Sequence, residues 1–183
     1  MFARPADSVL TETGVRPASA PSPLADEVAA MFDQHRTGLL RYLLSFGLGI
    51  PDAEEVVQEV FLALFRHLDQ GKPRTNIQAW IFRVAHNLGL KRGYAIRREA
   101  LSAEPEHRAD PAQNPEQQAA SRQRQLHLLA VVGALPEQDR RCLYLRAEGL
   151  RYREITDVLG MSLGAVAQSL ERSLGKLSRA DRA

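Results

Sequence analysis

Large apolar side chains recur every three or four residues in two long stretches of this 183-residue chain, and the stretch between them has almost none. This spacing places side chains on one face of a helix, because an α-helix turns once in about 3.6 residues. No segment shows the alternation of apolar and polar residues that is typical of a strand. The sequence therefore predicts an all-α protein, made of two small helical domains that a flexible linker joins.

The first helical domain is expected over residues 25–98, after a disordered tail at residues 1–23. The tail has four prolines and no apolar periodicity, so it cannot bury a core. Three amphipathic helices on short loops are predicted in the domain, which favours a compact bundle. Asp52 lies three residues before Glu55, as in a capping box, and this spacing predicts that Asp52 begins the second of these helices.

The second helical domain is expected over residues 123–183, after a linker at residues 99–122 that is rich in prolines, acids and glutamines. In this domain a short helix is predicted to end at Gly160, and Ser162 is positioned to cap the next helix. The apolar residues that would lock these two helices across a tight turn are Ile155, Leu159, Met161, Val166 and Leu170. The pair has the helix-turn-helix arrangement, in which the second helix enters the major groove of DNA. Helix pairs with a glycine turn also occur in proteins that bind no DNA.

Positive charge is concentrated in parts of the chain, although the net charge is only +2. A basic run without any acid contains Arg83, Lys91, Arg92, Arg97 and Arg98. Further arginines flank the predicted helix-turn-helix, among them Arg151 and Arg153. Cations in these places suit a polyanion such as DNA. At the C-terminal end of a helix they also suit the helix dipole, whatever the function.

Several classes of protein are disfavoured by what the sequence lacks. The single cysteine, Cys142, cannot form an internal disulfide, which fits a reducing cytoplasm, and its apolar neighbours predict that it is buried. The sequence contains no window of about 18 apolar residues that would predict a membrane-spanning helix, and no apolar signal segment is recognisable. We therefore expect a cytoplasmic protein. The five histidines lie far apart, and no glycine-rich loop could cradle a phosphate. We therefore expect no enzymatic activity, no metal and no cofactor.

Two groups of motifs, in order along the chain, carry a resemblance to a known family. Residues 52–61 (DAEEVVQEVF) and 79–87 (AWIFRVAHN) are similar to the polymerase-binding helix and the promoter-melting helix of bacterial extracytoplasmic-function (ECF) sigma factors. The motifs that look like region 4 of the same family lie at residues 135–137, 149–155, 159–162 and 164–166. A helix-turn-helix match alone would be weak, but two independent groups in the family's order are specific.

The resemblance implies a function and a set of residues for it. A sigma factor binds core RNA polymerase and directs transcription initiation at promoters, where its region 2 recognises the −10 element and its region 4 the −35 element. For polymerase binding the resemblance implies Asp52, Glu55, Gln58, Glu59 and Leu62. For the −10 element it implies Arg83, Asn87, Lys91, Arg92, Arg97 and Arg98, with an unstacked base taken up beside the loop from Gln70 to Gln78. For the −35 element it implies Arg151, Arg153, Ser162, Ala165, Ala167, Gln168, Ser169, Glu171 and Arg172.

The last helix is expected to present its share of these residues, from Ala165 to Arg172, outward. There Gln168 is suited to bond adenine, and Arg172 to contact guanine or a phosphate. The implied partners are core RNA polymerase, promoter DNA and an anti-sigma protein of the kind that often holds members of the family inactive.

The sequence departs from the family's pattern in three places. Lys91 stands where the family usually has an aspartate near the end of its melting helix. Ala167 and Ser169 stand where it usually has lysine or arginine on the recognition helix. We therefore predict weak or unusual recognition of a −35 element. Trp80 is suited to stack on a base, but its helical spacing with Ile77 and Val84 favours a place in the core.

Two other functions are compatible with parts of the pattern. A helix-turn-helix regulator that acts without polymerase would explain the second domain, but not the motifs of the first. A sigma-like interaction protein without promoter activity would explain why the recognition helix has fewer basic residues than is usual in the family. The acidic stripe from Glu55 to Leu62, taken without the resemblance, would be read as an ordinary solvated helix flank.

Overall fold

The computed structural model describes residues 22–100 and 119–182. Within these ranges the chain forms helices and no strand, as predicted. The helices in chain order are α1 (Pro23–Leu44), α2 (Ile50–Asp69), α3 (Ile77–Ala100), α4 (Ala119–Gly133), α5 (Glu137–Ala147), α6 (Tyr152–Leu159) and α7 (Leu163–Ala180). The predicted tail and linker lie mostly outside the described residues, although α3 ends and α4 begins inside the range predicted as linker. No helix of the described part is long and apolar enough to span a membrane.

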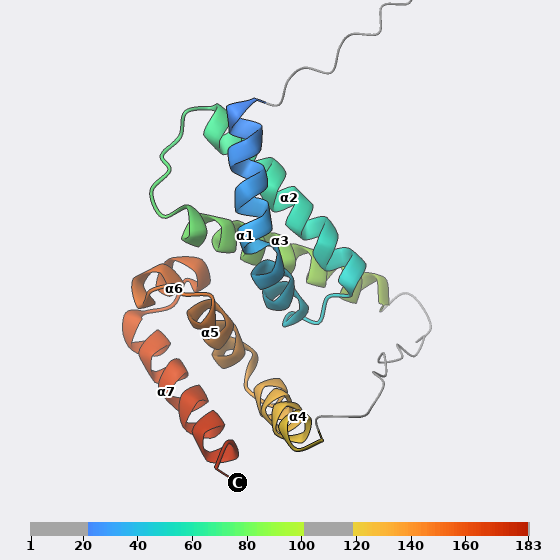
Figure 1. Ribbon diagram of the computed structural model, residues 1–183, viewed down its shortest axis with the longest axis vertical. Coiled ribbons are helices and arrows are strands. Elements are labelled where there is room, and N and C mark those ends of the chain that lie inside the picture. The colour runs from blue at the N-terminus through green and yellow to red at the C-terminus, as the bar shows by residue number, and fades with distance from the viewer. Residues whose placement is uncertain (1–21, 101–118, 183) are drawn as a thin grey trace, which may run out of the picture.

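The first three helices form the bundle predicted for the first domain (Figure 1). α1 and α2 pack against each other, and α3 crosses them. The centre of the bundle holds the fully buried side chains of Leu39, Tyr42, Leu64 and Phe82. The rings of Tyr42 and Phe82 meet edge to face, with their centroids 5.7 Å apart, a geometry that aromatic quadrupoles favour. This core fixes which faces of α2 and α3 remain at the surface.

The start of α2 differs from the prediction. The N-cap residue is Gly49, and no side chain caps the helix. Asp52 lies inside the first turn, and its carboxylate accepts two hydrogen bonds from Arg92 on α3 instead of closing a capping box. An acid in a first turn suits the helix dipole in either role. The distant arginine was therefore the partner that local spacing could not reveal.

The last four helices form the second domain, and α6 and α7 are the predicted helix-turn-helix. Gly160 ends α6 in the left-handed conformation, with φ 66°, which glycine adopts without steric cost. The hydroxyl of Ser162 accepts a hydrogen bond from the N–H of Ala165 and so caps α7, as predicted. Ile155 and Val166 are fully buried between the two helices. Cys142 is buried too, as its neighbours predicted.

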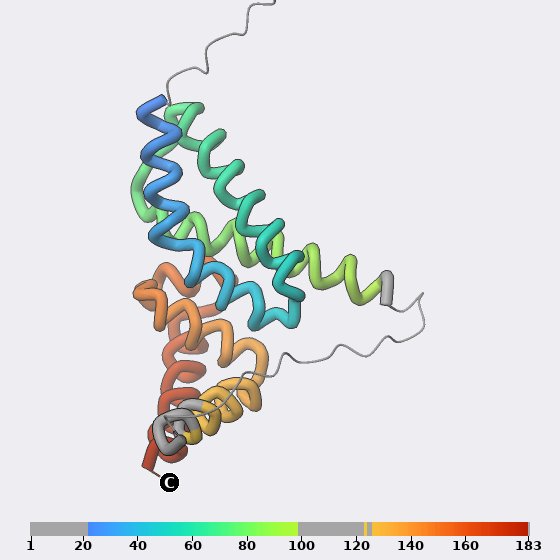
Figure 2. The backbone as a smooth tube through the Cα atoms, turned by 45° about the vertical axis from the view of Figure 1, so that its right-hand side comes forward, coloured from blue at the N-terminus to red at the C-terminus, as the bar shows by residue number. Residues whose placement is uncertain are grey.

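The two domains pack directly on each other. α6 lies against α3, and the C-terminal part of α1 touches α5. Figures 1 and 2 show this from two directions: α5 and α6 meet the bundle, while α7 extends away from it. The closed arrangement joins segments that are more than 100 residues apart in the sequence, since Arg41 bonds Glu148 across 107 positions.

Candidate functional site

A stripe of exposed side chains follows the outer face of α2, as the sequence predicted. Glu55, Gln58 and Glu59 are exposed, and Leu62 has 57% of its surface exposed. The opposite face carries the buried valines of the core. Leu62 thus leaves more than half of its surface exposed beside acids, and it also lines the groove described next.

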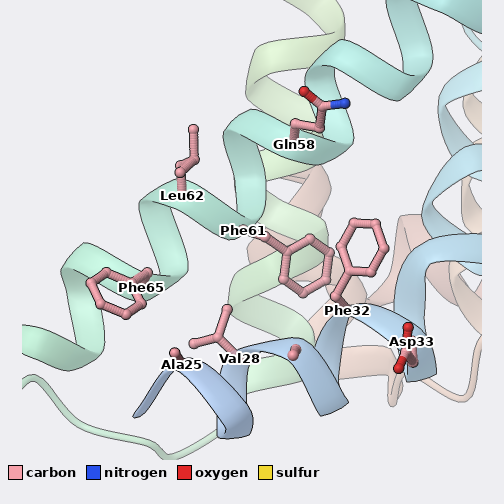
Figure 3. A pocket seen from close by; sticks show the side chains of 9 residues that line it. Ala25, Val28, Phe32, Asp33, Gln58, Phe61, Leu62 and Phe65 are labelled. Atoms are coloured by element: carbon pink, nitrogen blue, oxygen red, sulfur yellow. The ribbon is translucent and has the colours of Figure 1, made fainter. Parts of the chain in front are cut away.

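Beside this stripe, α1 and α2 enclose an apolar groove of about 490 Å³ (Figure 3). Phe32 of α1 and Phe61 of α2 meet edge to face inside it, with centroids 5.0 Å apart. Val28 and Phe65 add apolar surface, and Gln58 of the stripe lies along its edge. Stripe and groove therefore form one continuous surface of mixed apolar and acidic character.

Two of the predicted functional sets meet at Arg92. Its guanidinium lies 2.8 Å from a carboxylate oxygen of Asp52 and 2.8 Å from one of Glu55. The resemblance places Arg92 with the residues for the −10 element, and both acids with those for polymerase. The structure joins the two sets, so α2 and α3 are coupled at this point by charge.

The remaining predicted residues of α3 lie on its exposed side. Arg83, Asn87 and Lys91 are exposed and spaced four residues apart, which aligns them on one face. Arg97 lies over the ring of Tyr94, 5.2 Å from its centroid, and Arg98 is exposed. These side chains make the outer face of α3 a basic strip.

The inner face of α3 packs against the core of the first domain. Trp80 is half-buried, with its ring 4.6 Å from that of His67, as expected of a core position. Nδ1 of His86 and the hydroxyl of Tyr42 share a buried hydrogen bond of 2.8 Å. Burial, with the cation of Arg141 as a lesser cause, lowers the pKa of His86 to about 4, and burial raises the pKa of Tyr42. Both groups are therefore neutral members of the core at physiological pH.

On α7 the structure corrects one expectation. Gln168 and Glu171 are exposed, and Ala165 and Ala167 are partly so, but Ser169 is fully buried rather than outward-facing. Its hydroxyl donates a 2.6 Å hydrogen bond to the carboxylate of Asp139 on α5. The helix is turned so that position 169 lies against α5, and a residue there cannot touch a base.

The same carboxylate holds Arg172. Nε and Nη2 of Arg172 donate to Asp139 at 3.2 and 2.8 Å, while the arginine side chain remains 49% exposed. The hydrogen bonds from Arg172, together with that from Ser169, lower the pKa of Asp139, although its burial opposes this. Asp139 is thus a buried anion that anchors the recognition helix.

Sequence reasoning missed Asp139. It stands in the first turn of α5, where an acid is ordinary because of the helix dipole. Nothing in the neighbouring residues distinguishes it from such an acid. Its partners on α7 lie 30 and 33 positions away.

The two flanking arginines of the helix-turn-helix, Arg151 and Arg153, are exposed as predicted. Ser162, also exposed, serves as the cap of α7. Among the described residues, no group of three or more His, Cys, Asp or Glu side chains is arranged to hold a metal ion.

These features define a two-domain helical protein with an exposed acidic and apolar surface on one domain and a helix-turn-helix on the other. The comparisons with known proteins agree with that class. Residues 31–100 match the family model for Sigma-70 region 2, and residues 125–177 match that for Sigma-70, region 4. The chain is 31% identical to the RNA polymerase sigma factor CnrH of Cupriavidus metallidurans, over 79% of this chain and 81% of that one. It is 32% identical to the ECF RNA polymerase sigma factor SigE of Mycolicibacterium smegmatis, over 79% of this chain and 57% of that one.

Solved structures give the same result. CnrH in complex with the cytosolic domain of CnrY superposes with a TM-score of 0.54 at 26% identity, over 84% of this chain and 86% of that one. The sigma factor RpoE bound to the anti-sigma factor NepR from Bartonella quintana has the same fold, with a TM-score of 0.63 at 17% identity, over 86% of this chain and 98% of that one. The chain belongs to the ECF sigma factors of the sigma-70 family.

Proposed function

We propose that this protein is a sigma factor that joins core RNA polymerase and directs transcription initiation at specific promoters. The observation that carries the proposal is the presence, in one chain, of the exposed stripe on α2 and the helix-turn-helix of α6 and α7. A regulator that acts without polymerase would have no use for the first surface. The protein itself catalyses no reaction in this role and works in the cytoplasm.

The polymerase-binding surface is the stripe on α2. Gln58 and Leu62 contact the polymerase, and the acids Glu55 and Glu59 meet basic side chains on it. Exposed apolar side chains ringed by charge are typical of such docking surfaces, because the apolar part supplies affinity and the charges supply orientation. Asp52 acts indirectly, since its carboxylate holds Arg92.

The −10 surface is the basic strip on the outer face of α3. Arg83, Lys91, Arg97 and Arg98 contact phosphates, whose contribution is electrostatic and independent of sequence. Asn87 lies on the same face and has both a donor and an acceptor for a base edge. Arg92 is tied to Asp52 and Glu55 and supports this strip from the side.

The −35 surface is the exposed side of α7 with the arginines that precede it. Gln168 faces the base edges, and Arg172, steadied by Asp139, contacts guanine or a phosphate. Arg151 and Arg153 add phosphate contacts. With Ser169 buried, fewer side chains reach bases than the sequence alone implied.

A proteinaceous inhibitor is the third partner that we propose. The two solved structures compared above each hold a sigma factor with a second protein, the cytosolic domain of CnrY in one and the anti-sigma factor NepR in the other. An anti-sigma protein that binds this chain is the corresponding proposal.

In vitro transcription tests the proposed function. Core polymerase, genomic fragments and this protein should yield transcripts whose mapped start sites depend on the protein. Core polymerase alone is the control. If no start site depends on the protein, it is not an initiation factor. Co-purification with core polymerase then separates a sigma-like interaction protein from a regulator that acts alone.

A further inference from the structure

In the turn between α5 and α6, Glu148 makes two hydrogen bonds to the first domain. The carboxylate of Glu148 accepts a hydrogen bond of 2.8 Å from Arg41 of α1. The backbone carbonyl of the same residue accepts one of 2.6 Å from the side chain of Gln78, at the start of α3. Glu148 therefore joins two helices of the first domain to the helix-turn-helix.

A glycine in α1 makes room for this residue. A Cβ atom on Gly38 would lie 2.1 Å from a carboxylate oxygen of Glu148. Glycine is a poor helix former, so its presence well inside a helix of 22 residues calls for a packing reason. The Glu148 carboxylate supplies that reason, because only glycine lets it lie against the helix.

Two contacts from α5 support the same closure. Arg140 donates a hydrogen bond of 3.1 Å to the backbone carbonyl of Ser45, just after α1. The guanidinium of Arg141 lies 4.3 Å from the ring centroid of Phe46, a cation–π distance. Neither contact involves a residue proposed to bind DNA or polymerase.

The closed arrangement conflicts with simultaneous binding to both promoter elements. Sites centred at −10 and −35 are about 25 base pairs apart, or roughly 85 Å along B-DNA at about 3.4 Å per base pair. In the structure α6 lies directly against α3. In addition, Gln78, which ends the loop expected to take up an unstacked base, is already bonded to Glu148.

We propose that Glu148, seated on Gly38 and bonded to Arg41 and Gln78, is a latch that holds the free chain closed. Opening of this latch separates the helix-turn-helix from α3 and releases Gln78 before both promoter elements are occupied. The second step rests on the proposed function, whereas the first concerns the free protein alone.

Distances between spin labels in the free, full-length chain test the latch. Labels on Asp69→Cys and Ser178→Cys, both at exposed positions, report on the two domains, and Cys142 is buried from the reagent. The unaltered latch should give a single narrow distance distribution. Gly38→Ala and Glu148→Ala should each give a broader and shifted one. Combining the two should add little, because the new methyl group then meets no carboxylate.

Two control variants distinguish loss of the latch from nonspecific effects of a substitution in a helix or of a lost ion pair. Gly175→Ala changes another helical glycine, where a Cβ would meet only Arg179 at 3.7 Å. Glu27→Ala removes an ion pair with Arg74 inside the first domain. Both should leave the distances unchanged. Broad distances in the parent chain, or parent-like distances in both Gly38→Ala and Glu148→Ala, would overturn the proposal.

A second measurement links the latch to function. If closure opposes assembly, Gly38→Ala and Glu148→Ala should raise the association rate with core polymerase by about two- to fivefold, the effect of losing a partly exposed ion pair. An unchanged rate beside altered distances would overturn the gating step and leave the closed free state standing. A protein that never binds polymerase would refute the proposed function, and the distance result would be unaffected.

Discussion

Arg172 and Asp139 show how one ion pair can serve both a fold and a surface. The carboxylate is buried against α7, and the guanidinium is half exposed. Removing the charge of a buried partner leaves the other group without its hydrogen-bond acceptor. This lowers the free energy of unfolding by more than the loss of an exposed ion pair does. The pair therefore fixes the rotation of the recognition helix.

Asp139→Asn should lower the free energy of unfolding by about 1–3 kcal/mol at neutral pH, because the amide cannot hold Arg172 and Ser169 as the carboxylate does. Urea titration measures this. Asp157→Asn, at an exposed position on α6, is the control and should stay within about 0.5 kcal/mol of the parent. Equal stability of the two variants would mean that Asp139 does not anchor α7.

Arg172→Ala should weaken binding to a −35 duplex by about tenfold, the usual loss for one arginine contact. Arg179→Ala, at an exposed position two turns further along α7, is the matched control and should bind almost as the parent does. Fluorescence anisotropy at a fixed salt concentration measures both. No loss with Arg172→Ala would show that this side of α7 does not face DNA.

His86 predicts a pH dependence of stability. Its pKa is lowered to about 4 in the folded chain, so between about pH 4 and 6.5 the unfolded chain binds the extra proton. The stability that His86 contributes is thus complete above pH 6.5 and is lost as the pH falls towards 4, by up to about 3 kcal/mol. Urea titrations from pH 7.5 to 4.5 should show this slope, and His86→Gln should flatten it. An equally steep slope in the variant would assign the effect to other groups.

At the scale of helices, one face of α2 packs in the core of the first domain, and the other face is the proposed surface for core polymerase. The exposed Leu62 lies among acids, so its truncation should cost the fold little. Leu62→Ala should weaken binding to core polymerase by about five- to tenfold, as expected when an apolar interface residue is lost. Leu174→Ala removes an equally exposed leucine from α7 and should have no such effect. Pull-down titration against core polymerase compares them, and equal affinities would move the docking surface elsewhere.

Most helices and their termini were predictable, whereas two details of orientation were not. The cap at Ser162 and the turn at Gly160 depend on a few neighbouring residues, so local sequence reveals them. The capping box predicted at Asp52 is absent because α2 begins earlier, with Gly49 as its N-cap, and the Asp52 carboxylate instead binds Arg92, 40 positions away. Ser169 failed for a similar reason, since a small rotation of α7 about its axis decides which side is covered, and that rotation depends on α5.

At the scale of the whole molecule, the predicted division into two helical domains is consistent with the structure, but their direct contact was not foreseen. Two such units separated by a linker suggest independent bodies when only the sequence is considered. In the structure Arg41, Gln78 and Glu148 join the two domains by hydrogen bonds. Apolar residues of both domains also belong to one buried cluster, and α6 packs on α3, so the contact between the domains is apolar as well as polar.

Helix positions, the helix-turn-helix and the exposed stripe of α2 follow from apolar spacing and caps, which are properties of nearby residues. The family follows from motifs of the same local kind. The pairing of Asp139 with α7, the tie of Arg92 to Asp52 and the seat of Glu148 on Gly38 join residues that are tens of positions apart, up to 107 for the bond that Glu148 makes with Arg41. Such contacts depend on how whole helices pack, and no local pattern encodes the partner. The closed state of the chain therefore became visible only once the helices were placed in space.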